Sequence, residues 1–119
     1  MKAYTDIEQS KKLVELGIDV NTADMYWDDW KRMTKLISFP KVAGVIRIKD
    51  LHCWSLAALF DLLPTIKNYI PTLRRLSDGG YSCVYRHKTD NSDWIWYNAD
   101  NPVDACVDMI LKLNKENLL

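Results

Sequence analysis

The chain has no excess of charge of either sign and no long apolar run. Its 119 residues contain sixteen Lys and Arg and sixteen Asp and Glu, so the molecule as a whole has no general attraction for phosphate backbones or anionic lipid. No apolar stretch approaches the roughly 20 residues that a membrane span requires. The first residues, MKAYTDIEQSKK, also lack the apolar segment of a signal peptide. We therefore expect a cytoplasmic protein that makes no contact with a membrane.

The sequence also lacks the motifs of common enzymes. It contains no Walker loop, no GxGxxG, no GxSxG and no HExxH. A Cys–His nucleophile pair needs two side chains within hydrogen-bond reach. Cys83 and His87 share one face of a predicted strand but lie roughly 13 Å apart there, and His52 and Cys53 are direct neighbours in sequence. We therefore expect that the protein is not an enzyme and has no catalytic residues.

Side chains that bind metals are few and poorly spaced. The three cysteines are an odd number without a CxxC pair, which is typical of reduced thiols that pack as small apolar groups. The possible zinc ligands are His52, Cys53, Cys83, His87 and Cys106. They have no ligand-like spacing, and the cluster at 90–93 lacks the glycine and the final glutamate of a calcium loop. We expect no metal and no cofactor.

Among the residues that are present, the bulk composition is that of a folded globular protein. The hydrophobic share is 48% and the charged share is 27%, both ordinary for such proteins. A chain of this length fits one domain, here residues 1–119, and should bury roughly 65% of the surface that its unfolded form exposes.

Three segments carry the signals that begin and end helices. At 6–16, Thr5 and Glu8 form a capping box and Gly17 supplies the stop. At 56–63, Ser55 caps the helix and a proline closes it. The third helix begins at Asp100 or Asn101 with a proline in its first turn. Its apolar stripe, which we expect to face a sheet, comprises Val103, Cys106, Val107, Ile110 and Leu111, with Leu113 at its edge.

The same three segments resemble proteins of a known kind. MKAYTDIEQSKKL, CWSLAALFDLLP and NPVDACVDMILKLNKENLL are similar to a family of small, uncharacterised proteins carried by prophages and mobile elements of gut bacteria. The resemblance covers the first 13 or so residues, 53–64 and 101–119, a little over a third of the chain. It carries no activity to this chain. It implies a small cytoplasmic accessory protein of phage or mobile-element origin.

The segment between the first two helices gives weaker patterns. Residues 25–27 read as a short strand or a buried loop. Apolar residues at helical spacing predict a helix over 30–37, and the alternation over 42–48 predicts a strand. After the second helix, residues 65–70 could add one further turn of helix.

The second half of the chain predicts three antiparallel strands. They span 72–76, 81–88 and 94–98, and the turns at 78–80 and 89–93 separate them. In the last of these strands, strict alternation would place Trp94 and Trp96 on one face. The predicted fold is therefore α+β: an N-terminal helix, a core helix, a three-stranded antiparallel meander and a C-terminal helix packed on the sheet.

Five tryptophans in 119 residues suggest a surface that binds a partner. Exposed aromatic residues are typical anchors of protein interfaces, and the candidate anchors are Trp27, Trp30, Trp94 and Trp96. The leading hypothesis is a non-enzymatic protein-interaction module that binds an unknown protein partner or itself; plain packing of the aromatic rings is the other explanation. The alternative function is a nucleic-acid-binding regulator with a basic and aromatic sheet face. Its candidate residues are Arg74, Arg75, Arg86 and Lys88.

Overall fold

A computed structural model of the chain describes residues 1–28, 35–38 and 51–119. In chain order, its helices and strands are α1 (Ile7–Glu15), the short 3-10 helix η1 (Val20–Thr22), β1 (Met25–Asp28), β2 (Lys35–Ser38), β3 (Leu51–Cys53), α2 (Leu56–Asp61), β4 (Tyr69–Arg75), β5 (Tyr81–His87), β6 (Asp93–Ala99) and α3 (Pro102–Lys115). The predicted helix at 30–37 and the predicted strand at 42–48 fall partly or wholly outside the described residues.

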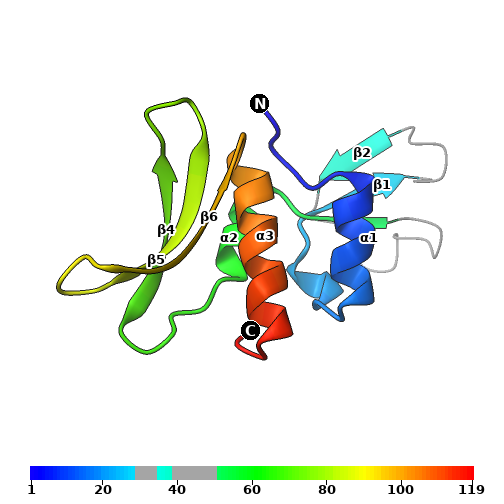
Figure 1. Cartoon of the computed structure of the whole chain (residues 1–119). Coiled ribbons are helices and arrows are strands. Elements are labelled where there is room, and N and C mark those ends of the chain that lie inside the picture. Colours follow the sequence, from blue (N-terminus) through cyan, green and yellow to red (C-terminus); the bar gives the residue numbers. More distant parts are fainter. Residues whose placement is uncertain (29–34, 39–50) are drawn as a thin grey trace.

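The predicted meander with its C-terminal helix is confirmed. Strands β4, β5 and β6 pair in that order, and both pairs are antiparallel. Figure 1 shows α2 and α3 between this sheet and the other half of the molecule, which consists of α1 and β1–β3. At the β4–β5 turn, Gly79 has a φ of +94°, a conformation that side chains with a Cβ rarely adopt. The fold is α+β, as the sequence predicts.

Strands β1, β2 and β3 form a second sheet that the sequence analysis missed. Its order is β2-β1-β3, and both pairs are antiparallel. Residues 25–27 are indeed in a strand, but the helix predicted for 30–37 is wrong over 35–37, because Lys35–Ser38 pairs with Met25–Asp28. Within a short apolar run, helical spacing and strand pairing cannot be told apart from the sequence.

The N-terminal cap lies one residue later than predicted. Asp6, not Thr5, caps α1, and its side chain accepts from the backbone of Gln9, whose own side chain accepts from the Asp6 backbone. The Thr5 hydroxyl is buried instead and binds Ser10 Oγ at 2.8 Å and the backbone N–H of Trp54 at 3.1 Å. Thr5 therefore joins the N-terminal segment to the chain that enters α2.

The other two helix caps follow the sequence. Ser55 caps α2 by accepting from the backbone of Ala58, and Asn101 caps α3 by accepting from the backbone of Asp104. After α2, however, residues 65–70 do not continue the helix. Ile66 and Tyr69 exchange backbone hydrogen bonds of 3.0 and 2.9 Å across a tight turn, and β4 begins at Tyr69.

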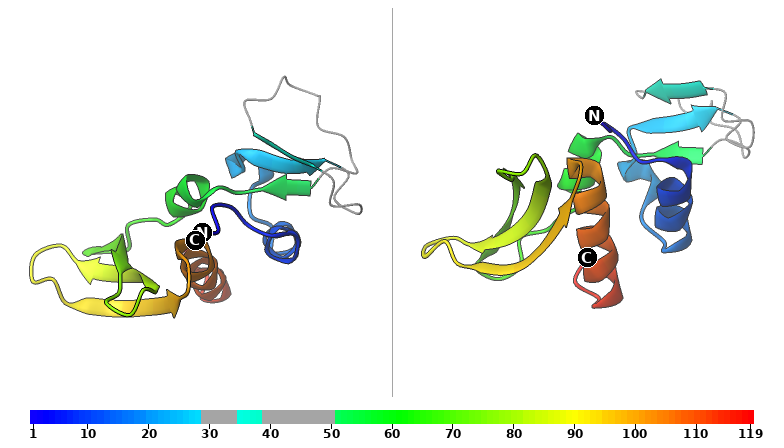
Figure 2. Two further views of the ribbon diagram at one scale, coloured as in Figure 1. Left: turned by 90° about the horizontal axis from the view of Figure 1, so that it is seen from above. Right: turned by 45° about the horizontal axis from the view of Figure 1, so that its top comes forward.

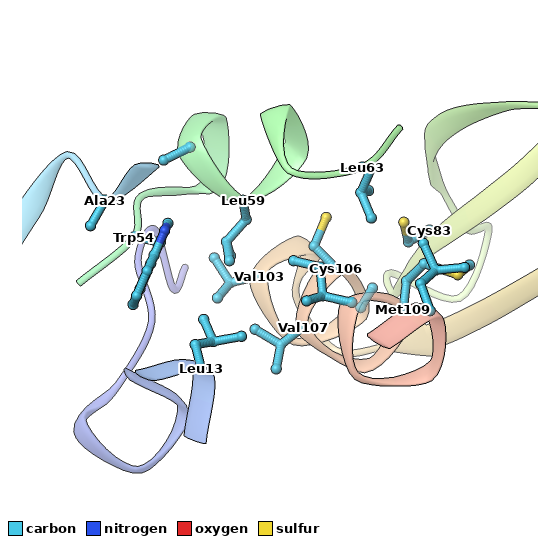
Figure 3. Close-up of a cluster of buried hydrophobic side chains, with 14 of the residues drawn as sticks. Leu13, Ala23, Trp54, Leu59, Leu63, Cys83, Val103, Cys106, Val107 and Met109 are labelled. Carbon is cyan, nitrogen blue, oxygen red and sulfur yellow. The ribbon is translucent and has the colours of Figure 1, made fainter. Parts of the chain in front are cut away.

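One buried cluster connects the two halves of the molecule. The cluster includes Leu13 from α1, Trp54, Leu59 from α2 and Met109 from α3, all fully buried, together with Cys83 from β5. Figure 3 shows Leu13 and Trp54 at one end of this cluster and Cys83 and Met109 at the other. The buried residues of α3 extend further round the helix than the predicted stripe. The reason is that α3 lies next to the sheet on one side and next to α1 on the other (Figure 2). Within the described parts of the chain, no helix is long and apolar enough to cross a bilayer.

Candidate interaction surface

The sheet β4-β5-β6 has one face toward the helices and one face toward solvent. Cys83 and Tyr85 of β5 point toward the helices and are fully buried. By alternation, Ser82 and Val84 lie on the opposite face, yet they are only 3% and 1% exposed. Side chains of the sheet itself therefore cover the centre of this outer face.

An ion pair forms part of that cover. Both terminal nitrogens of the Arg74 guanidinium donate to the carboxylate of Asp93, at 2.9 and 2.8 Å. This hydrogen bonding raises the pKa of Arg74 and lowers the pKa of Asp93. Because β5 lies between β4 and β6, the pair spans the middle strand. Arg74 and Asp93 line a shallow hollow of about 190 Å³ together with Leu76, Ser82, Val84, Trp96 and Asn98.

Strict alternation predicted that the two tryptophans of β6 share a face, but in the structure they lie on opposite faces. The pairing of β5 with β6 shifts register beside Tyr85, so that Tyr85 pairs with Ile95 but Arg86 pairs with Asp93. Trp94 is the extra residue of this bulge, which re-aims its side chain. Its ring lies 5.5 Å from Tyr69 and 5.9 Å from Tyr85, so Trp94 packs at the end of the inner face.

Trp96 remains on the outer face and is the more exposed of the two. It pairs with Val84 and is 54% exposed, compared with 40% for Trp94. Beside Trp94, a second hollow of about 300 Å³ is lined by Ile66, Lys67, Tyr69, Trp94 and Leu118. Strand β6 thus presents one tryptophan on each face of the sheet.

The other two candidate tryptophans lie elsewhere in the sequence. Trp27 is in β1, half-buried, with its ring 5.9 Å from Tyr4 in an edge-on arrangement. Its Nε1 is buried and has no hydrogen-bond partner within the described structure. Trp27 helps to line a hollow of about 280 Å³ formed with the N-terminal residues. Trp30 lies outside the described residues. Within the described residues, Trp27, Trp94 and Trp96 therefore do not form one surface.

Two of the four basic residues proposed to bind nucleic acid already form hydrogen bonds with other side chains of the protein. Arg74 is held by Asp93, and the guanidinium of Arg86 donates to Asn91 in the β5–β6 turn. Arg75 is exposed at the end of β4, and Lys88 follows β5 at the other end of the sheet. Strand pairing thus separates the four residues between the two ends of the sheet.

The buried cysteines and His87 are in contact with neighbouring side chains. Burial raises the pKa of the Cys53 thiol, while hydrogen bonding with Cys83 together with burial raises the pKa of Cys106. A raised pKa keeps a thiol protonated, and the thiolate is the nucleophile. His87 Nδ1 lies 3.1 Å from the hydroxyl of Thr89 in its own turn. Among the described residues, no three His, Cys, Asp or Glu side chains gather as metal ligands.

Sequence reasoning missed Asp93 and Asn98 as parts of this surface. Both are polar residues at the ends of a strand, a position that usually indicates only a turn. The one available signal was that Asp93 stands beside a run of large residues, DWIWY, where a bulge allows both faces to be filled. No protein-family model, no curated protein and no solved structure matches the chain.

Proposed function

We propose that the protein is a non-enzymatic protein-interaction module whose partner contacts the outer face of β6 at Trp96. The observation that carries this proposal is the exposure of Trp96, 54%, on a face whose neighbouring Ser82 and Val84 are already buried. The Trp96 ring lies beside Val84, its partner across the strands, and leaves more than half of its surface open to a partner. Large exposed aromatic rings supply much of the binding energy of protein interfaces when a partner covers them.

The charges around Trp96 favour a protein over a nucleic acid as this partner. Arg74 is neutralised by two hydrogen bonds to Asp93, so a phosphate would have to compete with a carboxylate for the same guanidinium. Nucleic-acid binding depends on cations that are free to replace counterions. Protein interfaces typically surround an apolar or aromatic centre with a polar rim. The Arg74–Asp93 ion pair beside Trp96 fits that composition.

The biological context of the module rests on the resemblance alone. We propose an accessory role in the cytoplasm of a bacterium that carries a prophage or mobile element, since three segments of the chain resemble such proteins. This context predicts a partner from the host, from the phage or from a second copy of the chain.

The test is capture from a lysate of a gut bacterium, with and without nuclease, followed by mass spectrometry. The baits are the full chain, Trp96→Ala and Val14→Ala; Val14 is a control because it is exposed on α1. We expect a specific protein that survives nuclease, is lost with Trp96→Ala and is kept with Val14→Ala.

Three results would contradict the proposal. Recovery that disappears with nuclease would assign the surface to nucleic acid. Equal recovery by the wild type and Trp96→Ala would place the partner elsewhere on the molecule. An empty eluate from a chain that is also monomeric in solution would leave Trp96 without a partner.

A further inference from the structure

We propose that strand β6 pairs antiparallel with β6 of a second copy, centred on Trp96, to form one continuous six-stranded sheet. This inference rests on the proposed function and names the partner of the same surface. Its starting point is that β6 is an edge strand, since the strand order is β4-β5-β6. An edge strand presents a row of backbone N–H and C=O groups to any chain that can pair with them.

The hydrogen bonds at the ends of the strands show which groups face outward. Leu76 N donates to Gly80 O and Lys88 N donates to Asn68 O, so even-numbered residues of β5 bond to β4. Odd-numbered residues of β5 therefore bond to β6, in agreement with the bond from His87 N to Ser92 O. Their partners in β6 are Ile95, Tyr97 and Ala99. The backbone groups of Trp96 and Asn98 consequently point away from the sheet.

No further strand pairs with this edge in the described structure. No backbone hydrogen bond outside the strand ladders reaches Trp96 or Asn98 within residues 1–28, 35–38 and 51–119. From Ile95 to Ala99 the pairing with β5 is regular, and β6 contains no proline or lysine, two residues that commonly protect sheet edges. The bulge at Trp94 ends the regular stretch on one side.

The opposite edge of the sheet is built differently. In β4 the same alternation turns the backbone of Tyr69, Pro71, Leu73 and Arg75 outward. Pro71 has no N–H, so the middle of the β4 edge lacks a donor. Of the two edges of this sheet, only β6 has a backbone donor at every outward-facing residue of its regular stretch, Trp96 and Asn98.

The proposed partner is a second copy because two β6 strands, paired antiparallel, place compatible side chains opposite each other. Antiparallel pairing about Trp96 places Trp96 opposite Trp96 and Ile95 opposite Tyr97, both within the regular stretch of β6. Aromatic pairs directly across two strands are favourable, and apolar side chains meet apolar ones on the inner face. The one charged residue of β6, Asp93, lies beyond the bulge and is already neutralised by Arg74. No like charges oppose each other, and the arrangement has the two-fold symmetry of most homodimers.

The first test is sedimentation equilibrium of the full chain over a wide concentration range, with three variants. Asn98→Pro removes an outward N–H that has no partner within the sheet, so it should fold and weaken the dimer at least about tenfold, because each of the two copies loses a donor. Asn98→Ala keeps that N–H and should dimerise like the wild type. Arg75→Pro makes the equivalent change at the β4 edge and should also leave the dimer unchanged.

A second pair of variants tests the register even if Asn98→Pro fails to fold. Trp96→Lys and Trp96→Glu place like charges opposite each other and should each be monomeric, whereas an equimolar mixture should form a heterodimer. A wild type that stays monomeric at millimolar concentration would overturn the inference, as would a dimer that survives Asn98→Pro or a mixture that stays monomeric. The proposed function would still stand if Trp96→Ala abolished capture of another protein.

Discussion

The two sheets of the molecule are held together in different ways. Strands β4, β5 and β6 are seven residues each and follow one another directly in sequence. Strands β1, β2 and β3 have four, four and three residues, and β1 pairs with β3 some 25 positions further along the chain. The first arrangement depends on local turns. The second depends on contacts that form only when distant segments meet, and its anchor is a set of polar contacts around Trp54.

Those contacts involve the chain that leaves β3. Trp54 is fully buried, and its Nε1 donates to Thr22 Oγ1 at 2.9 Å. Its backbone carbonyl accepts from Thr5 N at 2.9 Å. Ser55 N donates to the carboxylate of Asp24 at 2.8 Å. A short sheet can thus be fixed by hydrogen bonds from its flanking segments, whereas the longer sheet is fixed by its own register and by the helix packed on it.

The largest predicted effect is that of Trp54→Ala. Removal of a fully buried tryptophan should cost about 3–5 kcal/mol of unfolding free energy, because it leaves a cavity in the shared core. Trp96→Ala is the control and should cost only about 0.2–1 kcal/mol, the contribution of a cross-strand pair, because the ring is mostly exposed. Urea denaturation followed by circular dichroism measures both. Because one buried cluster connects both halves, both sheets should unfold in a single transition; separate transitions would show that the sheets are independent units.

A smaller effect is predicted for Thr5→Val, which tests the polar contacts of the short sheet. Valine keeps the volume but leaves the buried N–H of Trp54 without its acceptor, at a cost of about 1–3 kcal/mol. Thr5→Ser keeps the hydroxyl and loses one methyl group, at a cost of about 0.8 kcal/mol. Denaturation curves that show Thr5→Ser to be the more damaging change would mean that packing, not hydrogen bonding, holds this segment.

The smallest effect concerns the Arg74–Asp93 pair on the longer sheet. Arg74→Gln should lower stability slightly at neutral pH, because the pair is exposed to solvent. The pKa of Asp93 is lower in the folded protein, so its contribution is present above the unfolded value of about 3.9 and is lost as the pH falls through the folded value. The difference in thermal unfolding between wild type and variant should therefore begin to shrink below about pH 4 and disappear only below the folded-state pKa of Asp93. A difference that persists in acid would assign it to packing of the arginine stem.

The same contrast between the sheets explains what could be predicted from the sequence. The β4–β6 sheet and its helix followed from local signals: Gly79 in the turn, alternation through β5 and the start of α3 at Asn101 and Pro102. The β1–β3 sheet could not be predicted, because Met25 pairs with Cys53 and nothing local records that contact. A helix over 30–37 was predicted for the same reason.

The candidate surface was only half predictable. Exposure of Trp96 agrees with the sequence hypothesis, but alternation failed at Trp94 because one extra residue in β6 shifts the register beside Tyr85. A bulge leaves no reliable mark in a single sequence. Likewise, Thr5 was interpreted as a cap because its hydroxyl suits that role, whereas a buried partner 49 positions away uses it instead.

The three buried cysteines give the molecule a built-in set of reporters. Cys53 lies in β3, Cys83 in β5 and Cys106 in α3, and all are free thiols within the core. A reagent that alkylates thiols can reach them only when the surrounding structure opens. The rate at which Cys53 is labelled therefore reports how often the short sheet opens. The rates at Cys83 and Cys106 report how often the longer sheet and the helix packed on it open. Mass spectrometry of the labelled peptides would rank the two sheets by their opening frequency in the unaltered protein.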